Sequence, residues 1–125
     1  MKVFGIGIDM VDLNRVKIIY SKYGDKFAKK ILNHEEFRGY TNAKNKPSFL
    51  AKRFAAKEAI GKALGVGIMN GFLLKNISIS HNESGKPVVK LSEKKELKSY
   101  MNKEFYISIS DEKNFAIANA LILDK

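Results

Sequence analysis

The sequence predicts an α+β fold, with a largely antiparallel sheet, one long central helix and shorter helices packed on it. Three observations support this class. A strand pattern opens the chain, a long run rich in Ala, Leu and Lys lies near its middle, and the C-terminal half holds two hairpin patterns. With 125 residues, of which 45% are hydrophobic and 29% charged, we expect a single domain over residues 1–125.

The first strand is expected over residues 3–9, which alternate between large apolar side chains and a face that carries Gly5, Gly7 and Asp9. Glycine weakens the interior of a strand and often marks the close approach of another backbone or of a ligand. The two glycines therefore clear the face that ends in Asp9.

Three short helices are expected next. The first is capped by Asp12 and runs to about Tyr23, the second covers residues 25–32, and the third begins at residue 33 or 34 and includes Tyr40. Residues 41–46 are polar and are expected to form a loop.

The long helix is expected from Phe49 to about Leu64. Pro47 and Ser48 precede it, as is common in a first helical turn, and Gly65 ends it. Beyond it we expect a glycine-containing loop at 66–75, strands at 76–81 and 87–91, a helix from Ser92 to about Asn102, and strands at 105–110 and 115–123.

Composition excludes several classes of site. The chain has no cysteine, which removes disulfide scaffolds, thiolate zinc sites, iron–sulfur clusters and thiol nucleophiles. No apolar run approaches the roughly 18–20 residues of a membrane span, and no signal peptide is visible, so we expect a cytoplasmic protein. The net charge of +10 favours a polyanionic partner: nucleic acid, an anionic membrane, a phosphate-rich cofactor or an acidic protein.

Two carboxylates are the first candidates for chemistry. Asp9 either caps a helix or lies in a loop as an ordinary carboxylate, or it reaches a metal or a metal-bound phosphate. Asp12 is the better candidate for the helix cap. In the long helix, Glu58 and Lys62 are spaced i,i+4 beside small residues. This segment is either a solvated face or a rim that holds a magnesium polyphosphate, with Glu58 on the metal and cations such as Arg53 and Lys62 on the phosphates.

A basic stretch and two histidines complete the candidates. Residues 13–30 carry six basic side chains against one acidic one, Asp25, with apolar residues interleaved. They form either an ordinary amphipathic helix pair or a docking surface for an acidic partner, with apolar anchors inside a positive rim. His34 and His81 have no metal-ligand neighbour at a useful spacing, and we expect both to be structural or solvated.

Together these stretches resemble one family, the holo-[acyl-carrier-protein] synthases, which are the small trimeric class of 4′-phosphopantetheinyl transferases. The resemblance rests on Gly-Ile-Gly-Ile-Asp at 5–9 and Arg-Phe-Ala-Ala-Lys-Glu-Ala at 53–59. It extends through Lys-Ala-Leu-Gly at 62–65, Gly-Lys-Pro at 85–87 and the stretches at 108–110 and 116–118. The order and spacing fit over essentially the whole chain, which makes the combination specific.

The resemblance implies a Mg²⁺-dependent transferase of lipid metabolism. Such an enzyme moves the 4′-phosphopantetheine arm of coenzyme A to a serine of apo-acyl carrier protein, releases 3′,5′-ADP and supports fatty acid biosynthesis. By motif, Asp9 and Glu58 are similar to the two metal ligands of the family, and Lys62 to the lysine that reaches the pyrophosphate. Arg53 resembles a contact for the nucleotide phosphate end, and Gly85, Lys86 and Pro87 match a loop near the adenine. Glu58, or a water held by the metal and a carboxylate, is expected to accept the serine proton.

The resemblance also implies particular partners. It implies a homotrimer with active sites at the subunit interfaces, and an acidic carrier protein as the second substrate, with neither nucleic acid nor a membrane as partner. Contacts with the carrier protein are expected at Arg15, Lys22, Lys26 and Lys29, with Ile19 and Phe27 as apolar anchors.

One position departs from the family pattern. Many members have a histidine directly after a Ser-x-Ser motif, whereas Ser108-Ile109-Ser110 is followed here by Asp111. An aspartate does not bind a phosphate without a proton or a metal, so Asp111 is left out of the predicted site.

Two alternative functions remain at this point. A small nucleic-acid-binding module would explain the net charge and the interleaved aromatic residues, but not Asp9 and Glu58 beside the cations. A relative that has lost catalysis and only binds a carrier protein is disfavoured by the presence of both carboxylates.

Overall fold

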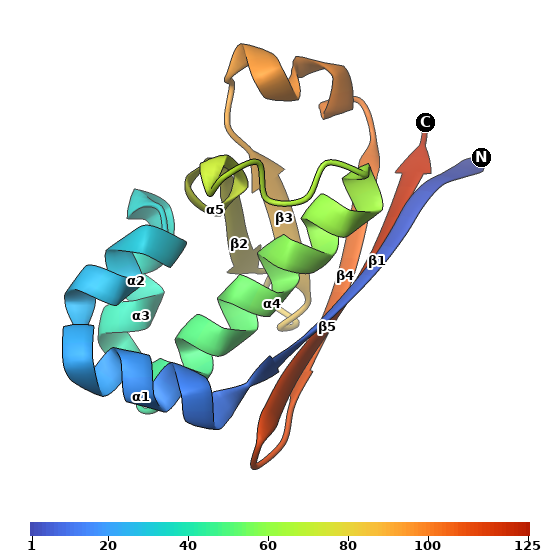
Figure 1. Cartoon of the computed structure of the whole chain (residues 1–125). Coiled ribbons are helices and arrows are strands. Elements are labelled where there is room, and N and C mark those ends of the chain that lie inside the picture. Colours follow the sequence, from blue (N-terminus) through green and yellow to red (C-terminus); the bar gives the residue numbers. More distant parts are fainter.

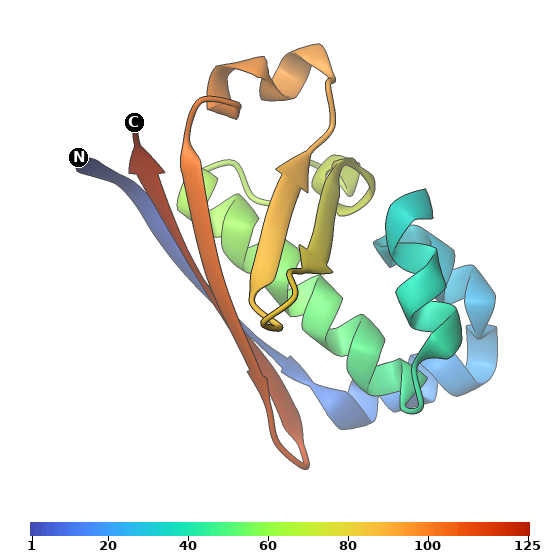
Figure 2. The ribbon, with the colours of Figure 1, turned by 180° about the vertical axis from the view of Figure 1, so that it is seen from behind.

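The long central helix organises the fold. In the computed structural model, which describes residues 1–125, α4 (Lys46–Leu64) lies across one face of a three-stranded antiparallel sheet (Figure 1). The strand order of this sheet is β1 (Lys2–Asp12), β5 (Phe115–Asp124) and β4 (Glu104–Asp111). A second, two-stranded sheet of β2 (Ile77–His81) and β3 (Pro87–Leu91) lies beside β4 (Figure 2). The predicted α+β class is confirmed.

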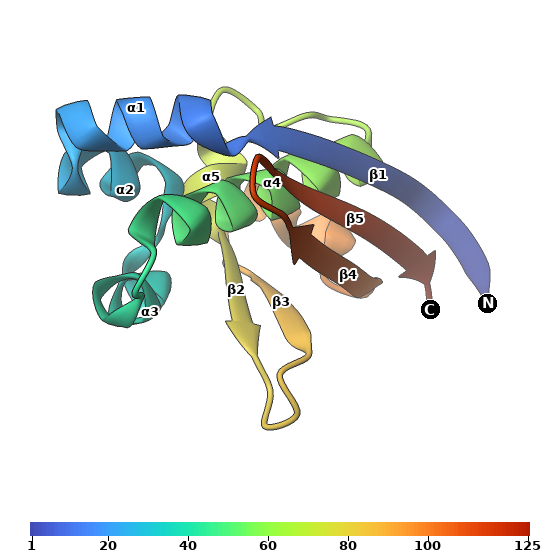
Figure 3. The same ribbon diagram turned by 90° about the horizontal axis from the view of Figure 1, so that it is seen from below.

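Shorter helices surround α4. The group comprises α1 (Leu13–Tyr23), α2 (Asp25–Ile31), the 3-10 helix η1 (His34–Glu36), α3 (Phe37–Asn42), α5 (Phe72–Asn76) and the 3-10 helix η2 (Lys95–Tyr100). Figure 3 shows α1, α2 and α3 gathered beyond the end of the sheet, around the first half of α4. No helix has the length and apolar character that a membrane crossing requires.

Two glycines allow β1 to pack directly on α4. A Cβ atom built on Gly7 would lie 2.0 Å from the backbone oxygen of Ala59, and one on Gly5 would lie 1.8 Å from that of Ala63. Real Cβ atoms do not come so close to a backbone oxygen, so a larger residue would push the strand away from the helix. The predicted close approach is confirmed, and the neighbour is the helix that carries Glu58.

Local signals set the ends of the main helices. The Asp12 carboxylate caps α1 by accepting hydrogen bonds from the backbone N–H groups of Asn14, at 2.8 Å, and Arg15. Asn45 caps α4, which therefore begins at Lys46, three residues before the predicted start. The left-handed backbone of Gly65 ends α4 as expected.

Two predictions for the second half of the chain are wrong. The segment 66–75, predicted as a loop, contains most of α5, which forms because Leu73 and Leu74 are buried against the core. The helix predicted from Ser92 to Asn102 is instead the shorter η2, in which one residue, Leu97, is buried. The hydroxyl of Ser92 bonds the Asn76 side chain at 2.8 Å, so it does not cap a helix.

The two faces of the three-stranded sheet differ. The inner face is packed on α4, and alternate residues of β5, such as Ala118, Ala120 and Ile122, are buried there. The outer face has no cover in the chain (Figure 1), and its large apolar side chains include Ile6, 69% exposed, and Ile8, 56% exposed.

Candidate active site

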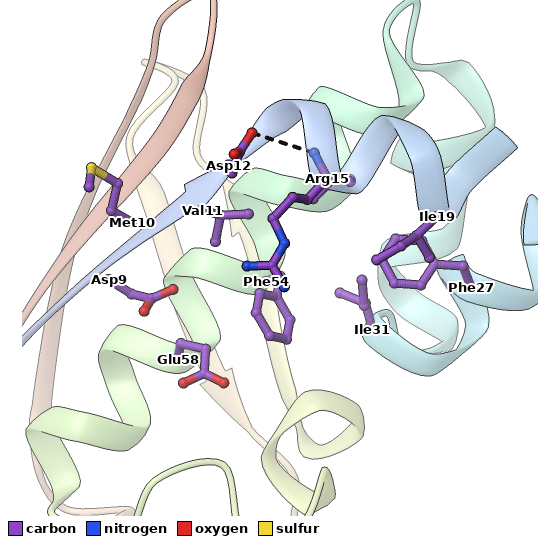
Figure 4. A pocket seen from close by; sticks show the side chains of 11 residues that line it. Asp9, Met10, Val11, Asp12, Arg15, Ile19, Phe27, Ile31, Phe54 and Glu58 are labelled. Carbon is purple, nitrogen blue, oxygen red and sulfur yellow. Dashed lines mark hydrogen bonds between the residues drawn. The ribbon is translucent and has the colours of Figure 1, made fainter. Parts of the chain in front are cut away.

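Two carboxylates meet where β1 passes over α4. Figure 4 shows Asp9 on the strand and Glu58 on the helix at one end of the same cavity. Burial raises the pKa of the Glu58 carboxyl above its usual value, and the negative charge of Asp9 raises it further, while Lys62 opposes the shift. Two like charges are therefore held together without full compensation, an arrangement that a cation would stabilise.

Lys62 belongs to the same cluster. Its Nζ donates hydrogen bonds to the Asp9 carboxylate at 3.1 Å and to the backbone oxygen of Ile8 at 3.0 Å. The ammonium group is thus paired with Asp9 on the neighbouring strand, and not with Glu58 one helical turn away. About half of the Lys62 side chain stays exposed, so the amine can also reach an anionic ligand.

The cavity beside the carboxylates has a volume of about 440 Å³. Its remaining walls come from α1, α2 and α4, and its floor is mostly apolar, with Ile19, Phe27 and Phe54 among the lining residues. Arg15 is its one basic lining residue (Figure 4). The cavity therefore joins a charged end to an apolar one.

The carboxylate pair fits Mg²⁺. Asp9 caps no helix, because Asp12 serves α1, and no group of three or more His, Cys, Asp or Glu side chains stands ready to enclose a metal. Mg²⁺ is usually held by one or two carboxylates and keeps several waters or substrate oxygens. A pair with an open side suits that preference.

A second cavity of about 470 Å³ lies between α4, β4 and the β2–β3 turn. It brings together the predicted nucleotide contacts Arg53, Gly85, Lys86 and Pro87. Three further side chains that the sequence analysis did not assign to the site also line it: Lys52, His81 and Asp111. The charge of this wall is mainly positive.

His81 had a signal in the sequence that was not used. In the β2–β3 hairpin it pairs directly with Pro87, so it lies next to the Gly-Lys-Pro segment. A hairpin register counted from the turn at 82–86 places the two residues opposite each other. Lys52 could not be found in this way, because it comes from α4. Asp111 was considered and left out of the predicted site, and the structure places it in the lining of this cavity.

Arg53 is held in place by a buried acid. Its Nε lies 3.2 Å from the carboxylate of Glu36, and its guanidinium lies over the Phe49 ring at 4.5 Å. Glu36 also accepts hydrogen bonds from the backbone N–H of Ile79 and from the Lys57 ammonium group. One carboxylate thus links α4, η1 and β2 and fixes the wall of the second cavity.

Lys57 has a structural role. Its side chain is fully buried, and its Nζ also donates to the backbone oxygens of Ile31 at 2.9 Å and Leu74 at 2.6 Å. Burial lowers the pKa of this lysine, and the Glu36 carboxylate opposes that effect. All donors of the ammonium are used inside the protein, so Lys57 does not face a ligand.

The predicted carrier-protein residues fall into two groups. Arg15, Ile19 and Phe27 line the first cavity, and Ile19 and Phe27 also line a smaller one together with Lys26. The other two predicted contacts, Lys22 and Lys29, are exposed and line neither cavity. The helix pair therefore offers apolar grooves bordered by positive charge.

The fold and the two cavities define a class of enzyme that handles phosphates, and comparison identifies its family. The model of the 4′-phosphopantetheinyl transferase superfamily matches residues 5–120, and the chain belongs to this family. It is 44% identical over 124 residues to the holo-[acyl-carrier-protein] synthase of Buchnera aphidicola, covering 98% of both chains. This family match lends no support to the nucleic-acid-binding alternative.

Solved structures of two holo-[acyl-carrier-protein] synthases have the same fold as this chain. The crystal structure of the Neisseria meningitidis holo-[acyl-carrier-protein] synthase has a TM-score of 0.87 and 37% identity to this chain, over 98% of this chain and 99% of that one. The Bacillus anthracis synthase, solved in complex with CoA (3′,5′-ADP), has a TM-score of 0.85 and 32% identity, with both chains fully covered.

Proposed function

We propose that this protein transfers the 4′-phosphopantetheine arm of coenzyme A to a serine of apo-acyl carrier protein and releases 3′,5′-ADP, a step that supports fatty acid biosynthesis. The observation that carries the proposal is that Asp9 and Glu58 line one end of the same cavity, with the Lys62 ammonium hydrogen-bonded to Asp9. The serine oxygen forms a bond to the phosphorus that carries the pantetheine, and the bond from that phosphorus to the ADP oxygen breaks.

The two cavities divide the substrate between them. Arg53 and Lys86 line the second cavity and bind the phosphates of the nucleotide end, while Gly85 and Pro87 border the adenine. Lys62 is placed to bind the pyrophosphate, since its ammonium group is half exposed beside Asp9. Binding at both ends fixes the reacting phosphorus near Glu58.

Asp9 and Glu58 would hold the metal ion. Mg²⁺ bound there would neutralise the charge that develops on the leaving 3′,5′-ADP. Glu58 also serves as a proton acceptor for the serine hydroxyl, directly or through a water.

The carrier protein docks on α1 and α2. Acyl carrier proteins are acidic, and Arg15, Lys22, Lys26 and Lys29 present positive charge that steers and orients such a partner. Ile19 and Phe27 serve as apolar anchors in the grooves between these cations.

We further propose that three copies assemble through the outer face of the three-stranded sheet. Phe4, Ile6, Ile8 and Met10 are 40–69% exposed along β1, and Phe115 extends the patch on β5. Apolar patches of this kind are rare on monomers and mark interfaces. Asp9 lies on this same strand, so the assembly would bring the active site close to a neighbouring subunit. The expected location remains the cytoplasm.

The experiment that tests the function is intact-mass measurement of an apo-acyl carrier protein incubated with CoA, Mg²⁺ and this protein. We expect a mass increase equal to one phosphopantetheine group, and no increase when EDTA removes the metal. Unchanged mass with several carrier proteins would overturn the proposed function.

A further inference from the structure

His81 lies at the positive cavity without a partner of its own. It ends β2 at the edge of the second cavity, and its imidazole forms no hydrogen bond or ion pair. The second cavity therefore has an unused imidazole on one wall, directly beside the predicted nucleotide loop.

Charged groups face His81 from every neighbouring element. From α4 come Lys52 and Arg53, from the β2–β3 turn Lys86, and from β4 Asp111. On its other side a shallower cavity adds three more groups from η1 and α3: Glu35, Glu36 and Arg38.

The acids among these groups are already engaged. Asp111 accepts a hydrogen bond from the Ser48 hydroxyl at 3.1 Å and lies 4.0 Å from the Lys52 ammonium. The buried Glu36 is held by Lys57 and Arg53, and Glu35 is paired with Lys90 at the surface. Asp111 is the one acidic residue that lines the second cavity, against the three cations Lys52, Arg53 and Lys86.

The surroundings of the His81 imidazole disfavour its charged form. Partial loss of hydration lowers the pKa of His81 below its usual value, and repulsion by Arg53 and Lys52 lowers it further. A phosphate dianion placed among these cations raises the pKa of His81, because it cancels their repulsion and attracts the imidazolium form.

We propose that His81 binds a phosphate group at the nucleotide end of coenzyme A and takes up a proton when it does so. His81 reaches the second cavity from β2, and Asp111 lines the same cavity from β4. The proposal rests on the proposed function, since it assigns coenzyme A to the second cavity. Affinity for the nucleotide is then coupled to pH through one side chain.

The direction in which affinity changes with pH follows from the rise in the pKa of His81 on binding. Binding raises the pKa of His81, so the gain in affinity is present at low pH and is lost as the pH rises through the pKa of the bound state. A rise of one pKa unit corresponds to about a tenfold change in affinity. Phosphate monoesters have their second pKa near about 6, so measurements above pH 7 keep the ligand a dianion.

The test is calorimetric titration of the protein with 3′,5′-ADP at pH 7.2 to 9. At each pH, two buffers of different ionisation enthalpy reveal the protons taken up. His81→Asn removes the titratable group and keeps a similar size, and His34→Asn, which alters the other histidine outside this cavity, is the matched control.

We expect the wild type and His34→Asn to take up protons on binding at pH 7.2 and to bind 3′,5′-ADP more weakly at pH 9 than at pH 7.2. His81→Asn should show no such uptake and a flatter dependence of affinity on pH. Equal proton uptake in all three proteins would overturn the role of His81. Absence of 3′,5′-ADP binding to any of them would instead overturn the proposed function.

Discussion

Replacing Gly7 by alanine would test the contact that brings the two carboxylates together. The new methyl group would lie 2.0 Å from the Ala59 oxygen and 2.7 Å from the Ala63 nitrogen, both backbone atoms of α4. A carbon and an oxygen that are not bonded normally stay about 3.3 Å or more apart. No side-chain rotation removes this overlap, so β1 has to move away from the helix by roughly 1 Å.

The expected cost follows from that displacement. Overpacking a core costs typically about 1–3 kcal/mol, and a clash between two backbones belongs at the upper end of that range or beyond it. For 125 residues the entropy of unfolding is about 0.26 kcal/mol/K, so about 3 kcal/mol lowers the melting temperature by roughly 10 °C. The shift also moves Asp9 away from Glu58, and a 1 Å misplacement in a catalytic site can cost about a hundredfold in rate.

Thermal unfolding and the rate of phosphopantetheine transfer measure the two effects. The matched control is Gly39→Ala, where the new methyl would lie 3.3 Å from the tip of the Phe49 ring, a side chain that can move. We expect the control to keep its activity and to gain up to about 1 kcal/mol, as alanine does in helices. A Gly7→Ala protein with wild-type stability and rate would refute the direct packing of β1 on α4.

Three further predictions concern the core, the partner surface and the assembly. Lys57→Met leaves the buried Glu36 short of a cation and should destabilise the protein by about 3–5 kcal/mol in denaturant titrations; a smaller loss than 1 kcal/mol would contradict the buried network. Lys22→Glu with Lys26→Glu should slow association with the carrier protein and weaken its salt dependence, without changing CoA affinity; unchanged association kinetics would exclude this face. Ile6→Lys should reduce the mass measured by light scattering from that of a trimer to that of a monomer, and an unchanged mass would place the interface elsewhere.

Much of the fold was predictable because its signals are local. Asp12 and Gly65 act through the backbone groups next to them, and the alternation in β1 and β5 reflects a sheet with one packed face. The pairing of Asp9 with Glu58 of the long helix was expected only from the family resemblance, since the two glycines indicated no more than a close neighbour. Gly5 and Gly7 leave room for a neighbouring backbone to lie against β1, and the backbone of α4 occupies that space.

Other features depend on tertiary contacts that no local pattern reports. α5 forms directly after a glycine-containing segment because its two leucines are buried against the core, a contact that a helix of five residues needs in order to be stable. In the sequence, Lys57 is indistinguishable from the other cations of a charged helix. In the structure, three acceptors from α2, η1 and α5 surround its ammonium group. The second cavity needs the β2–β3 hairpin to lie against α4 and β4, and no local pattern reports that contact.

The central claim is that Asp9 and Glu58 carry the transfer, and one comparison tests it most directly. The rate of mass gain by apo-acyl carrier protein is measured with the wild type, Glu58→Gln and the surface control Glu35→Gln, together with the affinity of each for CoA. Glu35 lies in an exposed ion pair outside both cavities, so its variant should behave as the wild type. We predict that Glu58→Gln stays folded, still binds CoA through the second cavity and loses transfer by a factor of about a hundred or more, the range reported for loss of a general base. Near-normal turnover in Glu58→Gln would contradict the account.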